Sequence, residues 1–149
     1  MATVQRSIRL DVPAQTAWEA CVALLCEPDP ARGMLARRCE PDPPRLDGIV
    51  VTTVAGAREL RSRIVELDEP HTVSTASEDE GPSVRTRLAV GPDPGGSRVT
   101  LTSEAATGLT GRPWLARLLD GVILGRSQRR SARATLARVR EIAARRDNP

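Results

Sequence analysis

The stretch Val84-Arg85-Thr86-Arg87-Leu88-Ala89-Val90 alternates between side chains suited to a protein core and side chains suited to water. Successive residues of a β-strand point to opposite faces of a sheet, so this alternation predicts a strand with one buried face. The two arginines mark the solvent face. The sheet that contains this strand is therefore expected to cover a core on one side only.

Further runs of β-forming residues lie on both sides of this stretch. The gaps between them are rich in Gly, Pro, Asp and Glu, and Gly and Pro favour turns because Gly reaches positive φ and Pro fixes φ. Strands linked by such turns predict an antiparallel meander. The expected strands are residues 49–55, 60–67, 72–78, 84–90 and 98–105, and the expected separators are residues 55–57, 68–70, 79–82 and 91–97.

The core face of this meander carries hydroxyls as well as aliphatic side chains. Alternation places Ser62, Thr75, Ser77, Thr86 and Ser103 on it. A buried hydroxyl without a hydrogen-bonding partner is costly, so two explanations stay open. The hydroxyls bond to one another, to the backbone or to trapped water, or they orient a ligand in a largely apolar pocket.

A strand and a helix are expected before the meander. Residues 4–12 alternate and predict a half-buried strand. Pro13 suits the first position of a helix, and apolar residues recur at helical spacing over residues 14–25. Five prolines interrupt residues 28–48, for which we expect one more short helix and then a turn.

One long helix is expected after the meander. After Gly111 the pattern turns helical and continues to about Arg146, with Pro113 in the first turn, and a helix of about 33 residues would be about 50 Å long. The first half is apolar almost all round, which predicts burial on more than one side and leaves homodimerisation open. One stripe along this helix holds Trp114, Leu118, Gly121, Gly125, Ala132, Leu136, Val139 and Ala143.

The order of strand, short helices, antiparallel strands and long helix is that of the helix-grip fold. Residues 7–18 resemble the opening strand, Val-Pro-Ala segment and Trp-bearing helix of the START-like, or SRPBCC, superfamily, which includes Bet v 1-like proteins and polyketide cyclases and dehydratases. Residues 65–70 are similar to that family's strand ending in an acidic turn, and residues 97–102 to its penultimate element before the long helix. The resemblance implies one α+β domain over residues 1–149. In it, a curved antiparallel sheet wraps around the long C-terminal helix, and two short helices follow the first strand.

The resemblance also implies an apolar cavity between the sheet and the long helix. Gly121 and Gly125 each cost about 0.5 to 1 kcal/mol relative to Ala in a helix interior, yet both lie on the stripe expected to face the sheet. They widen a ligand pocket, or they allow close packing or a kink. The residues expected to line the pocket are Ser62, Thr75, Thr86, Leu88, Leu101, Ser103, Trp114, Leu118, Gly121 and Gly125.

Few residues offer catalytic chemistry. The chain has one His, no Tyr and no Lys, and it contains neither a Gly-rich phosphate loop nor a nucleophile elbow. His71 could exchange protons near neutral pH, but a His beside a turn is more often exposed and idle. Cys21, Cys26 and Cys39 match no metal-binding spacing and are expected to be buried or idle thiols. We expect no metal and no cofactor, and the sequence assigns no catalytic residue.

Positive charge is concentrated near the C-terminus. Residues 126–146 contain eight Arg and one Glu, so they carry a net charge of +7 in a chain whose total is +3. This segment is either a solvated surface paired with acidic side chains or a contact site for an acidic protein, anionic lipid or nucleic acid. No aromatic residues interleave with it, which argues against single-stranded nucleic acid. One side of the expected helix, here called the Arg flank, consists of Arg126, Arg129, Arg130, Arg133 and Arg140.

These observations leave three functions open. The first is a carrier that encloses a hydrophobic small molecule, such as a lipid or a polyketide-like compound. The second is an enzyme of the polyketide cyclase or dehydratase type that works with His71, inward hydroxyls or an Arg. The third is an interaction module that uses the Arg flank. No stretch has the apolar length of a signal peptide or a membrane span, so a cytoplasmic location is expected.

Overall fold

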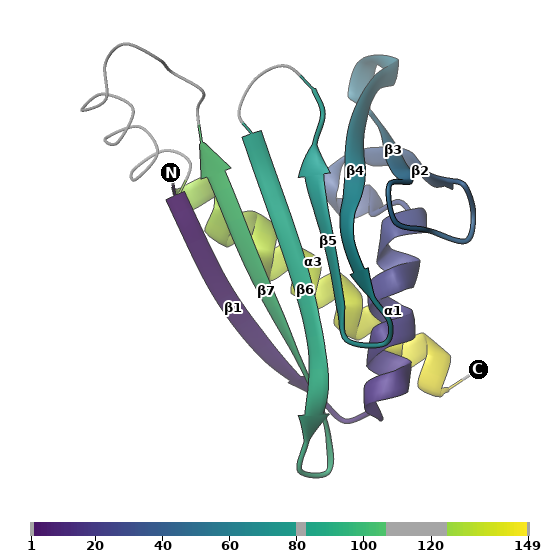
Figure 1. Cartoon of the computed structure of the whole chain (residues 1–149), viewed down its shortest axis with the longest axis vertical. Coiled ribbons are helices and arrows are strands. Elements are labelled where there is room, and N and C mark those ends of the chain that lie inside the picture. The colour runs from purple at the N-terminus through teal and green to yellow at the C-terminus, as the bar shows by residue number, and fades with distance from the viewer. Residues whose placement is uncertain (1, 80–82, 107–124, 149) are drawn as a thin grey trace.

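The computed structural model describes residues 2–79, 83–106 and 125–148. Seven strands form one antiparallel sheet in the order β1-β7-β6-β5-β4-β3-β2. The sheet curves around the C-terminal helix, as Figure 1 shows, and this confirms the helix-grip fold. The strands are β1 (Ala2–Leu10), β2 (Met34–Glu40), β3 (Ile49–Val54), β4 (Arg58–Asp68), β5 (Thr72–Ser77), β6 (Ser83–Asp93) and β7 (Gly96–Ala106). The helices are α1 (Ala14–Cys26) and α3 (Gly125–Asp147), with single 3-10 turns η1 (Pro30–Arg32) and η2 (Ala55–Ala57).

The meander expected from alternation is confirmed in β3 to β7. One separator is a correction: residues 91–97 are not a loop, because β6 and β7 continue through them and pair as far as Asp93 and Gly96. Only Pro94 and Gly95 connect the two strands. Gly95 has a φ of 75°, a left-handed conformation that Gly adopts without steric cost. The result is a long, tight hairpin.

The proline-rich segment between α1 and β3 differs from the expectation. The second short helix is the single turn η1, in which the Asp29 side chain accepts a hydrogen bond from the Ala31 backbone N (3.2 Å). Gly33, with a φ of 77°, ends this turn. β2 then follows, a strand that the sequence reading missed, and it pairs with β3 at the edge of the sheet.

α1 begins one residue later than expected, because Pro13 is its extended N-cap rather than its first helical residue. One face of α1 is buried as the spacing predicted, including Ala17, Trp18 and Cys21. α3 packs against α1, β1 and β7.

The described part of α3 buries most of the predicted stripe. Gly125, Ala132, Leu136, Val139 and Ala143 are buried, as expected, and Trp114, Leu118 and Gly121 lie outside the described residues. All five arginines of the Arg flank are exposed. None of the helices in the described ranges is long and apolar enough to cross a bilayer.

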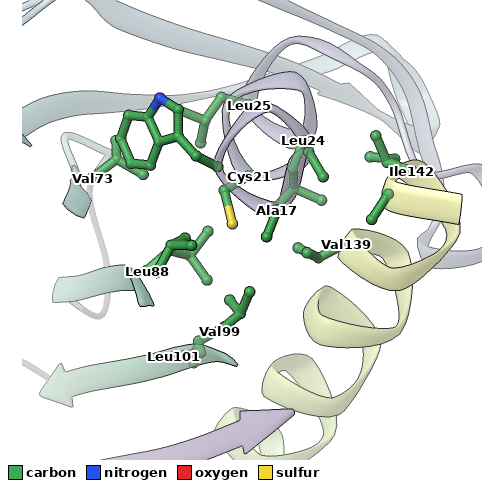
Figure 2. Close-up of a cluster of buried hydrophobic side chains, with 14 of the residues drawn as sticks. Ala17, Cys21, Leu24, Leu25, Val73, Leu88, Val99, Leu101, Val139 and Ile142 are labelled. Carbon is green, nitrogen blue, oxygen red and sulfur yellow. The ribbon is translucent and has the colours of Figure 1, made fainter. Parts of the chain in front are cut away.

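Aliphatic side chains occupy much of the space between the sheet and helices α1 and α3. Leu88, Val99 and Leu101 come from the sheet, and they meet Cys21 of α1 and Val139 of α3 (Figure 2). The core therefore consists largely of small and medium-sized side chains, as expected for a chain without Phe or Tyr.

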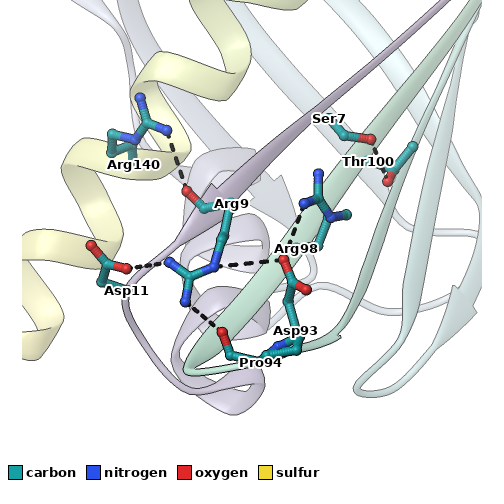
Figure 3. Close-up of polar contacts among 8 residues, drawn as sticks. All are labelled: Ser7, Arg9, Asp11, Asp93, Pro94, Arg98, Thr100 and Arg140. Atoms are coloured by element: carbon teal, nitrogen blue, oxygen red, sulfur yellow. Dashed lines mark hydrogen bonds and ion pairs between the residues drawn. The ribbon is translucent and has the colours of Figure 1, made fainter.

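A group of charged side chains fastens the β6–β7 hairpin to β1 (Figure 3). The Arg9 guanidinium contacts the Asp11 carboxylate, lies 3.6 Å from that of Asp93 and donates to the Pro94 carbonyl (2.7 Å). Arg98 donates to the same Asp93 carboxylate (3.1 Å). We call Arg9, Asp11, Asp93, Pro94 and Arg98 the Arg9 cluster. Through it the end of the hairpin is attached to the end of β1.

Candidate functional site

A small cavity lies between the sheet and the helices. Its volume is about 120 Å³, and it is called the central cavity below. The exposed residue Ser131 forms part of its wall, and we therefore take the entrance of the cavity to lie beside Ser131. Its walls consist of Leu24 and Leu25 (α1), Arg32 (η1), Met34 and Arg37 (β2), Val73 and Thr75 (β5), Thr86 and Leu88 (β6), and Ser131 and Thr135 (α3).

Arg32 enters the cavity wall from η1. The short turn, capped by Asp29 and ended by Gly33, aims the guanidinium at α3. There its Nη1 donates to the Thr135 hydroxyl (2.9 Å) and its Nη2 to the Ser131 hydroxyl (2.7 Å). Burial lowers the pKa of Arg32, and the Asp29 carboxylate acts in the opposite direction. An arginine stays protonated despite such a shift, so a positive charge lies at this wall.

Arg37 brings a second guanidinium to the same cavity from β2. Its Nε donates to the Thr52 hydroxyl (3.1 Å) and its Nη1 to the Leu24 carbonyl near the end of α1 (3.0 Å). Burial lowers the pKa of Arg37, and the like charge of Arg32 lowers it further. The two cations therefore share one partly desolvated space.

The sheet contributes two hydroxyls and several apolar groups. Thr75 and Thr86 are direct partners across the β5–β6 pair, so their side chains stand together on the inner face. Within the described ranges, neither side chain makes a hydrogen bond. Leu24, Leu25, Val73 and Leu88 supply apolar surface around these hydroxyls.

The structure brings together only some of the residues expected at a ligand site. Thr75, Thr86 and Leu88 line the central cavity. Leu101 is fully buried in the core, and the Ser103 hydroxyl already accepts a hydrogen bond from Gln128 Nε2 (3.2 Å). Ser62, which pairs with Ser77 and Val50, and Gly125 are not among the cavity residues. Trp114, Leu118 and Gly121 lie outside the described residues.

Sequence reasoning missed four polar residues of the cavity: Arg32, Arg37, Ser131 and Thr135. The spacing of Ser131 and Thr135, four residues apart on an expected helix, places them on one face and was the available signal. Arg32 and Arg37 gave no such signal, because arginine in a proline-rich segment usually faces solvent.

Larger concave regions lie on the outside of the molecule. One, of about 390 Å³, lies beside α1 and combines apolar side chains such as Trp18 and Val22 with acidic ones such as Glu19, Glu27 and Asp42. Another, of about 310 Å³, borders β1 and α3 and includes Arg6, Arg133 and Arg140. We place the candidate site in the smaller central cavity because sheet and helices together enclose it there.

Neither the three thiols nor the single imidazole lines the central cavity. Cys21 is fully buried, and burial raises its pKa to about 12. Burial likewise raises the pKa of the Cys39 thiol, so both are protonated and unreactive at neutral pH. His71 is exposed at the β4–β5 turn. The described ranges contain no group of His, Cys, Asp and Glu side chains suited to a metal ion.

Residues 1–144 match the family described as polyketide cyclase / dehydrase and lipid transport. The chain belongs to this family. The match covers nearly the whole sequence and agrees with the superfamily indicated by residues 7–18. No curated protein matches the chain.

Solved structures of the same fold have low sequence identity to this chain, as three examples show. The crystal structure of Ara h 8.0201 has a TM-score of 0.70 at 12% identity and covers 95% of this chain and 97% of that one. Truncated norcoclaurine synthase from Thalictrum flavum has a TM-score of 0.66 at 13% identity, with 95% and 90% covered. A protein from Thermobifida fusca, solved by NMR in solution, has a TM-score of 0.56 at 25% identity, with 83% of each chain covered. The first two similarities concern the fold alone.

Proposed function

We propose that this protein binds a hydrophobic small molecule, lipid-like or polyketide-like in character, in the central cavity between the sheet and α3. The observation that carries the proposal is the cavity itself, which opens inside the core and combines apolar walls with a few hydroxyls. Small-molecule sites commonly have this composition. Family membership supports the proposal, since the family's description names lipid transport and polyketide chemistry. Thr75, Thr86 and Leu88 are the proposed contacts from the sheet.

The size of the cavity limits what it encloses. Its volume of about 120 Å³ is below the roughly 300 Å³ at which typical ligand pockets begin. In another protein an apolar cavity of about 150 Å³ holds a benzene molecule. A fully enclosed ligand is therefore small, and a longer lipid or polyketide chain would insert one end beside Ser131.

A cyclase or dehydratase activity is a second candidate, and the two guanidiniums favour it. A fixed positive charge stabilises an enolate oxygen when a carbonyl compound reacts. The cavity walls offer guanidiniums and hydroxyls, whereas His71 lies at a distant exposed turn. Because proton transfer would have to pass through a hydroxyl or water, we place binding before catalysis.

Blocking the cavity entrance tests the proposed binding site. In the Ser131→Trp variant an indole would cover the entrance, and we expect the affinity for 1-hexanol to fall by about tenfold or more, which is about 1.4 kcal/mol. Ser127→Trp is the matched control, since Ser127 is also exposed and lies one helical turn away without lining the cavity. Amide chemical shifts of ¹⁵N-labelled protein, followed during titration, give both the affinity and the place of binding.

Two results would contradict the proposed function. One is saturable binding of 1-hexanol that changes the amide chemical shifts of residues lining the region of about 390 Å³ beside α1 and leaves the shifts of Thr75 and Thr86 unchanged. The other is equal loss of affinity in the Ser131→Trp and Ser127→Trp variants. Native mass spectrometry of protein purified from its host adds a direct measurement, the mass of any bound natural ligand.

A further inference from the structure

The walls of the central cavity carry two positive charges that no carboxylate of the described residues contacts directly. Arg32 and Arg37 line it, and none of the lining residues in the described part of the chain is acidic. The buried Asp29 carboxylate accepts a hydrogen bond from the Ala31 N–H, and it acts on both arginines only at a distance, where it offsets part of the burial that lowers their pKa. Across the described ranges, no ion pair within 4.0 Å involves Arg32 or Arg37.

Neutral groups hold the two guanidiniums in place and leave donors unused. A guanidinium has five N–H donors. Arg32 uses two of them for the hydroxyls of Ser131 and Thr135, and Arg37 uses two for the Thr52 hydroxyl and the Leu24 carbonyl. The contacts fix both side chains, yet they neutralise neither charge.

Hydroxyl groups surround the same space with further donors. Ser131 and Thr135 accept hydrogen bonds from Arg32, so their own O–H groups remain available to donate. Thr75 and Thr86 add two more hydroxyls on the sheet side of the cavity. A set of two cations and several hydroxyl donors complements an oxyanion, because hydrogen bonds between ionised partners are about twice as strong as neutral ones.

We propose that the ligand carries a carboxylate, and that this group binds between Arg32 and Arg37 while the apolar part of the ligand contacts Leu24, Leu25, Val73 and Leu88. This inference rests on the proposed function, which it deepens by naming the polar end of the ligand. A carboxylate suits the site better than a larger phosphate group because the cavity is small. Inorganic phosphate is therefore one arm of the test.

The test compares matched pairs of small molecules and matched variants. Hexanoate and 1-hexanol share an apolar chain and differ in charge, whereas acetate and inorganic phosphate carry charge with little or no chain. We expect hexanoate to bind at least about tenfold more tightly than 1-hexanol, because hydrogen bonds to charged groups are worth more than that factor. Isothermal titration calorimetry and amide chemical shifts measure each affinity.

The variants assign the preference to these side chains. Arg32→Gln and Arg37→Gln should each weaken hexanoate by about tenfold while leaving 1-hexanol within about twofold. Arg130→Gln, which removes an exposed charge from α3, is the control and should change neither affinity. If Arg37→Gln fails to fold, as judged by circular dichroism, Arg32→Gln and the isosteric Thr75→Val and Thr86→Val variants complete the test.

The outcomes separate the inference from the proposed function. Equal affinities for hexanoate and 1-hexanol in the native protein would contradict the proposed carboxylate. They would leave the proposed binding of an apolar ligand unaffected. Equal affinities for acetate and hexanoate would agree with the anion site between Arg32 and Arg37 but contradict the proposed function, binding of an apolar ligand. Tighter binding of inorganic phosphate than of hexanoate would overturn the choice of carboxylate. Absence of binding by all four molecules would overturn both proposals.

Discussion

Arginine occurs in two contrasting settings in this molecule. In the Arg9 cluster, guanidiniums lie near the surface and contact Asp11 and Asp93 (Figure 3). In the central cavity, Arg32 and Arg37 are more enclosed, and their hydrogen bonds within the described ranges go to neutral oxygen atoms. Arginine thus forms ion pairs where solvent already screens its charge, and forms none among the described residues where solvent is partly excluded.

This difference separates arginines that serve the fold from arginines that serve a ligand. A protein under selection for stability alone gains little from a desolvated cation without a counter-ion, because burial of charge is costly. Functional sites often carry such costs, which the rest of the fold offsets. The contrast therefore predicts that changes in the Arg9 cluster affect stability, and that changes in the cavity affect binding.

The largest effect is expected at the hairpin beside the Arg9 cluster. A Cβ added at Gly96 would lie 2.1 Å from the Leu10 carbonyl oxygen, a backbone atom that cannot move without separating β1 from the hairpin. Gly96→Ala should lower the free energy of unfolding by about 3 kcal/mol. Gly91→Ala is the control, because a Cβ there has no neighbour within 4 Å. Urea titration measures both, and equal stability of the two variants would show that the hairpin contact is not structural.

A smaller effect, with opposite signs, is expected from matched arginine substitutions. Arg9→Met removes the contacts to Asp11, Asp93 and Pro94 and should destabilise by about 1 kcal/mol. Arg32→Met removes a desolvated cation, and its hydroxyl partners can turn to water or to each other, so stability should rise by up to about 1 kcal/mol. Thermal unfolding of both variants in the same buffer makes the comparison. A loss of stability in Arg32→Met as large as that in Arg9→Met would remove the distinction between the two settings.

The smallest effect is expected on the outer face of the sheet, at Glu66. Like the arginines of the Arg9 cluster, this residue is a charged side chain with a partner of opposite charge, Arg87. Hydrogen bonds from Ser74 (2.7 Å) and then from Arg87 (3.1 Å) lower the pKa of the Glu66 carboxyl below its ordinary value. A lowered folded-state pKa contributes stability above the ordinary pKa, and this contribution is lost as the pH falls through the lowered value. Glu66→Gln should therefore cost about 0.5 kcal/mol at neutral pH and almost nothing at about pH 3. Unfolding curves at both pH values check this, and a cost that is the same at both would show that the carboxylate charge contributes nothing.

The sequence predicted the meander well because its signals are local. Alternation in residues 84–90 and turn residues at short intervals define strand positions without knowledge of the fold. β2 was missed because prolines surround it and its alternation is masked by Arg37, Arg38 and Glu40. The resemblance of residues 7–18 to a known superfamily supplied the overall architecture.

The site was only partly predictable, for a different physical reason. Alternation was enough to place Thr75, Thr86 and Leu88 on the inner face of the sheet, where they line the cavity. Arg32 and Arg37 become cavity residues through contacts with α3, α1 and β3, which are assembled only in the folded chain. A periodicity of two or of 3.6 residues carries no information about such contacts.

Each cavity arginine also joins elements that are far apart in the chain: Arg32 links η1 to α3, and Arg37 links β2 to the end of α1. An anion bound by both arginines would connect η1, α3, β2 and the end of α1 through one group of contacts. Occupancy would then slow amide hydrogen exchange in η1 and in the last turn of α1, well beyond the atoms that the ligand touches. A filled cavity would thereby be more rigid than an empty one without a change of shape.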